Sequence, residues 1–97
     1  MSTRWLLAAE AAADLDHLTD FLLASAPEAA LETVDIIFDG LSILASHPLV
    51  GRPMQGGLRE LVISRGRTGY LALYRYDMQA DLVLVLAVKH QRESGYH

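Results

Sequence analysis

The chain has 97 residues, no cysteine and a formal net charge of −4 at pH 7. This length suits a single domain over residues 1–97 with a core of modest size. Without cysteine there is no disulfide or thiolate chemistry, which fits a reducing compartment. Carboxylates from Glu10 onward interrupt the apolar start, and no stretch approaches the roughly 18 apolar residues of a membrane span. We therefore expect a cytoplasmic protein without a secretory signal or membrane contact.

Charge divides unevenly along the chain. Residues 1–46 carry one arginine and eight carboxylates, a net charge of −7, whereas residues 47–97 carry seven cations and four carboxylates, a net charge of +3. One interpretation is a solvated acidic helical face beside an ordinary sheet. The other is a positive surface that receives an acidic partner segment. The excess is too small for a nucleic-acid footprint, so we expect no direct DNA binding by this chain alone.

The first half of the chain predicts a short strand and a helical hairpin. A strand is expected over residues 4–7, and the apolar stripe of the following helix consists of Ala11, Leu15, Leu18 and Leu22. The carboxylates Asp14, Asp16 and Asp20 fall mostly off this stripe and are expected to face water. The tight link to the next helix indicates that the two helices are antiparallel.

Capping chemistry is expected where the second helix begins. The Ser25 hydroxyl and the Glu28 carboxylate, three residues apart, match a capping box, with Pro27 in the first turn. The helix is predicted to run to about Ala45 and to end before His47-Pro48. Its predicted apolar face consists of Leu31, Val34, Phe38, Leu41 and Ala45, widened by Ile37 and Leu44.

After a loop over residues 48–57, three strands are predicted over residues 58–64, 70–76 and 82–89. Short connections make them an antiparallel meander, so the fold class is α+β: a helical hairpin on one face of a small sheet. The last strand is apolar on both faces, with Leu82, Leu84, Leu86 and Val88 on one and Val83, Val85 and Ala87 on the other. Such a strand is usually central and covered twice. Two helices cover one face only, so the C-terminal tail, a second copy or another protein must shield the other.

The order of these elements and of several short motifs resembles the RelE/ParE superfamily of type II toxin–antitoxin toxins, over essentially the whole chain. The residues that carry the likeness are Trp5, Ala9, Asp14-Leu15, Leu18, residues 48–52, Arg59-Glu60-Leu61, Tyr70, Tyr74-Arg75 and residues 88–92. The resemblance implies a cognate antitoxin that wraps the toxin with its C-terminal segment. It also implies one of two activities, messenger RNA cleavage on the ribosome or poisoning of DNA gyrase.

The ParE side of the superfamily is the better match. RNA cleavage needs a base, an acid and cations for the phosphate, and RelE-like chains supply them from the central loop, a strand arginine and the C-terminal region. Here the loop over residues 51–57 offers only Arg52, position 71 is Leu71, and the last strand is followed by His90-Gln91-Arg92. Lys89 is the only lysine. We therefore expect a ParE-like gyrase poison rather than an enzyme.

Site residues follow from this expectation. No catalytic residue, metal or cofactor is assigned; a nuclease would use Arg52, Arg59, Arg75 and His90. Partner binding is expected from Arg52, Arg59, Leu71, Leu73, Arg75, Val83, Val85, His90 and Arg92, facing an acidic amphipathic antitoxin segment. Each arginine also has a plainer interpretation, an internal ion pair such as Arg52 with Glu60. Two alternatives stay open for the function: a ribosome-dependent mRNA endonuclease, and a non-toxic interaction module of the same fold.

Overall fold

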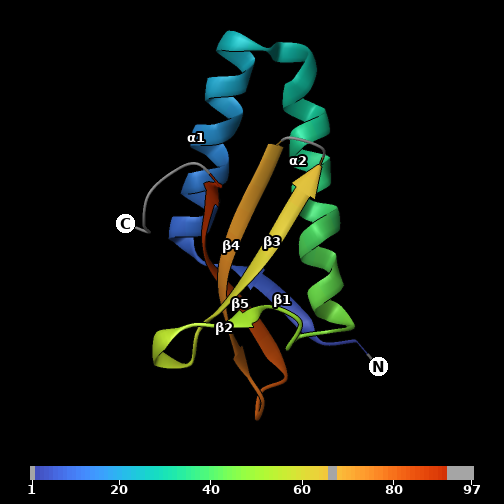
Figure 1. The fold of residues 1–97 in the computed structure, drawn as a ribbon, viewed down its shortest axis with the longest axis vertical. Helices are drawn as coiled ribbons and strands as arrows, with labels where there is room; N and C mark the ends of the chain where they lie inside the picture. Colours follow the sequence, from blue (N-terminus) through green and yellow to red (C-terminus); the bar gives the residue numbers. More distant parts are fainter. Residues whose placement is uncertain (1, 66–67, 92–97) are drawn as a thin grey trace.

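A five-stranded sheet and a helical hairpin form two layers (Figure 1). The computed structural model describes residues 2–65 and 68–91. The strands lie in the order β1-β5-β4-β3-β2. Their bounds are β1 Arg4–Leu7, β2 Arg52–Pro53, β3 Arg59–Arg65, β4 Thr68–Asp77 and β5 Leu82–His90. The β3-β4-β5 meander is antiparallel and β1 runs parallel to β5, so the predicted α+β class is confirmed. The last strand is an interior strand between β1 and β4, but the middle of the sheet is β4.

The first helix, α1 (Ala9–Ser25), follows its predicted stripe. Ala11 and Leu15 are buried, and Leu18 packs against the edge of the core. Asp14 differs from the expectation: its carboxylate does not simply face water but accepts a hydrogen bond from the Val88 N–H at 2.9 Å. The apolar stripe thus packs α1 on the sheet, and one carboxylate adds a polar tie to β5.

The predicted cap of the second helix is wrong. Ser25 is the last residue of α1, and its hydroxyl donates to the Phe21 carbonyl at 2.8 Å. Serine in a helix can bond back to the carbonyl four residues earlier, and here this bond uses the hydroxyl that a cap would need. The helix α2 (Pro27–Ser42) begins after Ala26 without a side-chain cap, and a 3-10 turn, η1 (Ile43–Ala45), ends it.

The buried face of α2 also differs from the prediction. Leu31 and Phe38 are 79% and 38% exposed, whereas Ala30, Ile37 and Leu41 are buried. For Leu31 the reason is visible in Figure 1, where the tip of the hairpin extends past the ends of the strands and so has no sheet beneath it. Phe38 lies near the other end of α2 and packs against Trp5, with ring centroids 6.0 Å apart. Lower down, α2 approaches the sheet closely: a Cβ at Gly40 would lie 2.8 Å from the Ile63 side chain.

The core lies between the helices and one face of the sheet. Besides the helix residues it contains Leu61, Ile63, Tyr70, Ala72, Tyr74, Val83, Val85 and Val88. The side chains of β5 alternate between the two faces of the sheet until a register shift opposite Leu73 and Tyr74. Val83 and Val85 face the helices on one side of this shift, and Val88 faces them on the other. The predicted loop over residues 48–57 contains the two-residue strand β2, too short to leave a periodic signal.

Candidate partner-binding surfaces

The face of the sheet that the helices leave uncovered is apolar with a cationic margin. We call it the open sheet face; it consists of Leu6, Val62, Leu71, Leu73, Arg75, Leu82 and Leu84. Leu6 and Val62 are 56% and 52% exposed, and the four other leucines are half-buried. The exposed Arg75 stands opposite Leu84 across the β4–β5 pair. Contiguous exposed apolar surface of this kind marks an interaction site in soluble proteins.

Two residues expected on this surface lie elsewhere. Val83 and Val85 have no exposed surface and pack under the helices, so the assignment of these two valines to partner binding is wrong. Because residues 82–88 of β5 are all apolar, their sequence carries no signal for which set of side chains faces the helices. The leucines at positions 82 and 84 occupy the open face instead.

The predicted arginines at the β2 end of the sheet are held by internal partners. The Arg52 guanidinium contacts the Glu60 carboxylate at 2.6 Å through Nη2 and 2.9 Å through Nε. This Arg52 side chain is still 69% exposed, whereas that of Glu60 is 4% exposed. Arg59 donates to the carbonyls of Leu49 and Gly51 at 3.0 and 2.8 Å. Arg52 therefore retains an outward surface, and the role of Arg59 is to hold the loop before β2.

A buried tyrosine holds the same loop from below. The Tyr74 hydroxyl accepts the Gly51 N–H at 2.8 Å, and the Tyr74 side chain is fully buried. Burial raises the pKa of Tyr74 above its ordinary value, partly offset by the Gly51 N–H and by Arg59. A side chain at position 51 would collide with this ring, because a Cβ there would lie 2.6 Å from Tyr74 Cε1. Tyr70 on the same face of β4 is also buried, whereas Tyr76 is only half-buried.

A second hydrogen-bonded cluster lies where β4 ends and the chain turns into β5. The Asp81 carboxylate accepts bonds from the Thr3 hydroxyl at 2.7 Å and the Tyr76 hydroxyl at 2.8 Å. These two donors lower the pKa of Asp81, since they favour the charged carboxylate. The same bond from its hydroxyl to Asp81 raises the pKa of Tyr76. The cluster fixes the β4–β5 turn against the start of the chain.

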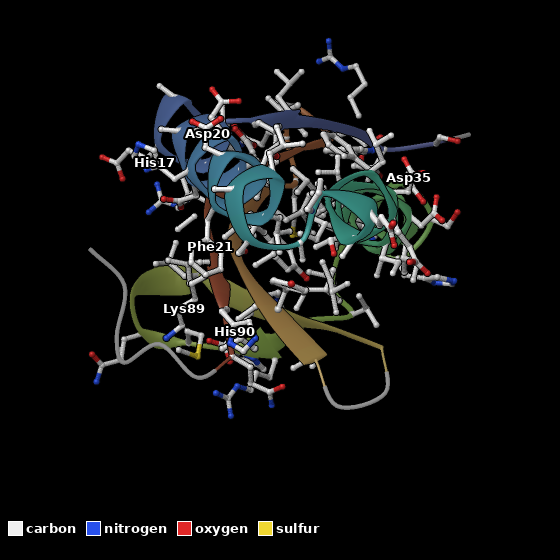
Figure 2. All side chains as sticks on the ribbon, turned by 90° about the horizontal axis from the view of Figure 1, so that it is seen from above. His17, Asp20, Phe21, Asp35, Lys89 and His90 are labelled. Carbon is white, nitrogen blue, oxygen red and sulfur yellow. The ribbon has the colours of Figure 1, made fainter. Side chains whose placement is uncertain are left out.

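A groove runs between α1 and the end of β5, on the helix side of the molecule. Its lining residues are Asp14, His17, Leu18, Phe21, Val88, Lys89 and His90, around a volume of about 410 Å³. Figure 2 shows Phe21 on the side of α1 that faces Lys89 and His90, with Asp35 on the far helix. Phe21 is 66% exposed, so an aromatic ring stands beside basic side chains at the rim. No sequence pattern indicates this surface, because it joins residues of α1 and β5 that are more than 60 positions apart.

The four residues that a nuclease would use do not come together. Arg59 is paired with Tyr74, and His90 with Tyr70, so they stand four residues apart along β4, about 13 Å at 3.3 Å per residue. The His90 ring packs edge-on against Tyr70, with centroids 5.4 Å apart. Arg75 projects from the other face of the sheet, since its neighbour Tyr74 is in the core. Arg92 lies outside the described residues.

Comparisons with known proteins agree with this fold. The model of a family described as the ParE toxin of the type II toxin–antitoxin system parDE matches residues 6–95. A protein named toxin RelE3 from Caulobacter vibrioides is 36% identical over 80 residues, which are 82% of this chain and 85% of that protein. The chain belongs to the ParE toxin family of type II toxin–antitoxin systems, within the RelE/ParE superfamily.

Solved structures give the same result. The chromosomal ParDE system from P. aeruginosa superposes with a TM-score of 0.75 at 26% identity, covering 91% of this chain and 95% of that one. The toxin–antitoxin complex RelBE2 from Mycobacterium tuberculosis gives a TM-score of 0.58 at 28% identity, covering 94% and 100%. No helix within the described part of the chain is long and apolar enough to cross a membrane.

Proposed function

We propose that this chain is a cytoplasmic toxin that poisons DNA gyrase and is neutralised by a cognate antitoxin. The observation that supports the gyrase target is the separation of Arg52, Arg59, Arg75 and His90 over two faces and both ends of the sheet. General acid–base cleavage of RNA requires such groups within hydrogen-bond reach of one phosphodiester. Arg59 is also occupied with the carbonyls of Leu49 and Gly51. The chain then acts as a binder and not as a catalyst.

The antitoxin is proposed to cover the open sheet face with an acidic, amphipathic segment. Its apolar side chains would bury Leu71, Leu73, Leu82 and Leu84, and its carboxylates would lie near Arg75 and the outward side of Arg52. The support is the chemistry of the surface, which combines exposed leucine and valine side chains with arginine at its margin. The similarity to structures of toxin–antitoxin systems adds to this argument.

The target is tested by two assays on the same purified chain. One measures DNA supercoiling by gyrase, and the other measures cleavage of messenger RNA on translating ribosomes. We expect supercoiling to be inhibited and the messenger to remain intact. Ribosomal cleavage that disappears in His90→Ala would instead assign the RNA endonuclease activity. Expression of the chain alone that leaves growth unchanged would identify a non-toxic interaction module.

A further inference from the structure

The helical layer carries a strong negative charge that the proposed antitoxin surface does not use. All eight carboxylates of residues 1–46 lie within α1 and α2. Every lysine and arginine of the chain lies outside these two helices. One layer of the molecule is therefore anionic and the other carries the cations, so a partner of the helices should differ in charge from a partner of the sheet.

An apolar strip on α2 is exposed within this anionic layer. We call it the α2 strip; its members recur at the three- and four-residue spacing of one helix face and are Leu31, Val34 and Phe38. Leu31 and Phe38 are 79% and 38% exposed, and Val34 is half-buried. The strip continues onto β1, because the Trp5 ring packs against Phe38 with centroids 6.0 Å apart.

Carboxylates run alongside the α2 strip. They lie at intervals of four, three and four positions, which places them on one side of the helix; they are Glu28, Glu32, Asp35 and Asp39, all exposed. Figure 2 shows Asp35 on the outer side of α2. Leu31 and Asp35 are four positions apart and are neighbours on the helix surface, so the apolar and acidic strips adjoin.

The tip of the hairpin extends the apolar surface toward α1. It reaches past the ends of the strands in Figure 1, and from residue 21 to residue 31 the only polar side chains are Ser25 and Glu28. Leu23 of α1 is 54% exposed. The exposed small residues of the tip are Ala24, Ala26 and Pro27. An apolar projection of this kind marks an interaction site and not a part of the core.

The charge of the helical layer decides between the possible occupants. Two copies of the chain that packed through this surface would bring together eight carboxylates from each copy, and like charges across an interface are strongly unfavourable. The phosphates of nucleic acids and the anionic headgroups of membranes would be repelled in the same way. A protein surface that has an apolar hollow with lysine and arginine around it complements both strips.

We propose that the α2 strip and the hairpin tip dock on a lysine- and arginine-rich surface of gyrase. This inference rests on the proposed function and specifies which side of the chain meets the target. An enzyme that handles DNA presents such cations to the phosphate backbone, so it has the charge that the helical layer requires. Leu31 and Phe38 would be buried against gyrase, and Asp35 would lie near its cations.

The test is Leu31→Arg in the full chain, with Leu49→Arg as the matched control. These leucines are 79% and 51% exposed, so both variants should fold, which circular dichroism checks. The control adds the same charge outside the helices. The readout is the concentration of the chain that halves supercoiling by purified gyrase. We expect it to rise at least about tenfold for Leu31→Arg and less than about threefold for Leu49→Arg.

Two further measurements separate the contributions and the partners. Asp35→Lys should raise the inhibitory concentration at least about threefold at low salt and less at high salt, because salt screens the charges of the acidic strip. The affinity of Leu31→Arg for the protein encoded by the adjacent reading frame, measured by calorimetry, should change less than about threefold. The α2 strip and the open sheet face then act on different partners.

Each outcome decides the matter. Unchanged inhibition by a folded Leu31→Arg, or an equal loss in Leu49→Arg, overturns this inference and leaves the gyrase target standing. No inhibition by the unsubstituted chain overturns the proposed target and this inference together. Should Leu31→Arg not fold, Asp35→Lys decides, and unchanged inhibition at low salt refutes the docking surface. A loss of antitoxin affinity in Leu31→Arg would assign the strip to the antitoxin, and a dimer that this variant dissociates would assign it to a second copy; either result overturns the inference.

Discussion

At the scale of single residues, the contact between Tyr74 and Gly51 joins the core to the loop before β2. The ring is buried against the hydrophobic core, and its hydroxyl satisfies the backbone N–H of a residue 23 positions earlier. Glycine is required at position 51 because of close approach rather than because of an unusual φ. One tyrosine thus fixes both the packing of β4 and the path of the chain into β2.

We expect Tyr74→Phe to lower the free energy of unfolding by about 1–3 kcal/mol, because the Gly51 N–H loses its acceptor in a buried site. Urea denaturation followed by circular dichroism measures this loss. Tyr76→Phe is the control, since its hydroxyl bonds to an exposed carboxylate and should cost less. Equal losses for the two variants would contradict a special role for the buried hydroxyl.

Asp81 is predicted to make stability depend on acid. Its pKa is lowered in the folded chain by the bonds from Thr3 and Tyr76. The contribution of Asp81 to stability is therefore complete above pH 3.8, the ordinary pKa of aspartate. It is lost as the pH falls below 3.8 through the lower pKa that Asp81 has in the folded chain. Asp81→Asn, which tolerates the positive φ of 51° at this position, should be less stable at pH 7. The difference between the melting temperatures of the two proteins should narrow as the pH falls below 3.8; a constant difference would refute this.

At the scale of elements, a side chain of α1 takes a backbone hydrogen bond of β5 that no strand provides. β1 pairs with residues 82–85 of β5 and ends there. Beyond that point, the Asp14 carboxylate takes the Val88 N–H that a longer β1 would have bonded. A bond from a backbone N–H to a charged acceptor is among the stronger hydrogen bonds in proteins.

Asp14→Ala should therefore destabilise the chain by about 1.5–3 kcal/mol, since a backbone donor at the sheet edge loses a charged acceptor. Asp16→Ala removes a carboxylate from the exposed side of the same helix and should change stability by less than about 0.5 kcal/mol. Thermal unfolding at neutral pH compares the two variants. Similar effects would indicate that the Asp14 bond contributes little.

The elements that the sequence predicts well are those with an unbroken period. The α1 stripe from Ala11 to Leu22 needs only its spacing, and the interior place of β5 follows from the apolar run over residues 82–88. The buried face of α2 could not be predicted in the same way, because the overhang of the hairpin tip, which exposes Leu31, is a property of the assembled layers. The choice between Val83 and Leu84 for the core likewise depends on which face the helices cover.

At the scale of the whole molecule, the unequal distribution of charge leads to a prediction about the partner. Arg75 lies on the open sheet face and is exposed, so Arg75→Glu should leave stability within about 0.5 kcal/mol. Binding of an acidic antitoxin segment should weaken at least about tenfold, because the new glutamate would repel the carboxylates that Arg75 attracts. Calorimetry at two salt concentrations measures the affinity of each variant. The difference in affinity between Arg75→Glu and the unsubstituted chain should be smaller at high salt, because salt screens the charges.

Gln79→Glu serves as the control for this experiment, because it adds a carboxylate in the exposed β4–β5 turn and not on one of the strands that form the open sheet face. The partner affinity should then hardly change. If both variants weaken binding equally, the effect comes from net charge and not from the open sheet face. If neither does, the acidic segment binds elsewhere, and the groove beside Phe21 becomes the next surface to test.

The candidate site was less predictable than the fold, because its residues depend on how the elements assemble. The cationic residues were identifiable from sequence, but whether Arg59 faces a partner or its own loop depends on where residues 49–51 pass. The Phe21 groove required knowledge that α1 lies along the end of β5.

The parallel pairing of β1 with β5 has a consequence for synthesis on the ribosome. Arg4 is opposite Leu82, so the strand that is translated first waits for the one translated last before the sheet can close. Native contacts so distant in sequence form slowly and cannot form on a partial nascent chain. The sheet that carries the open sheet face is therefore complete only after β5 has been made.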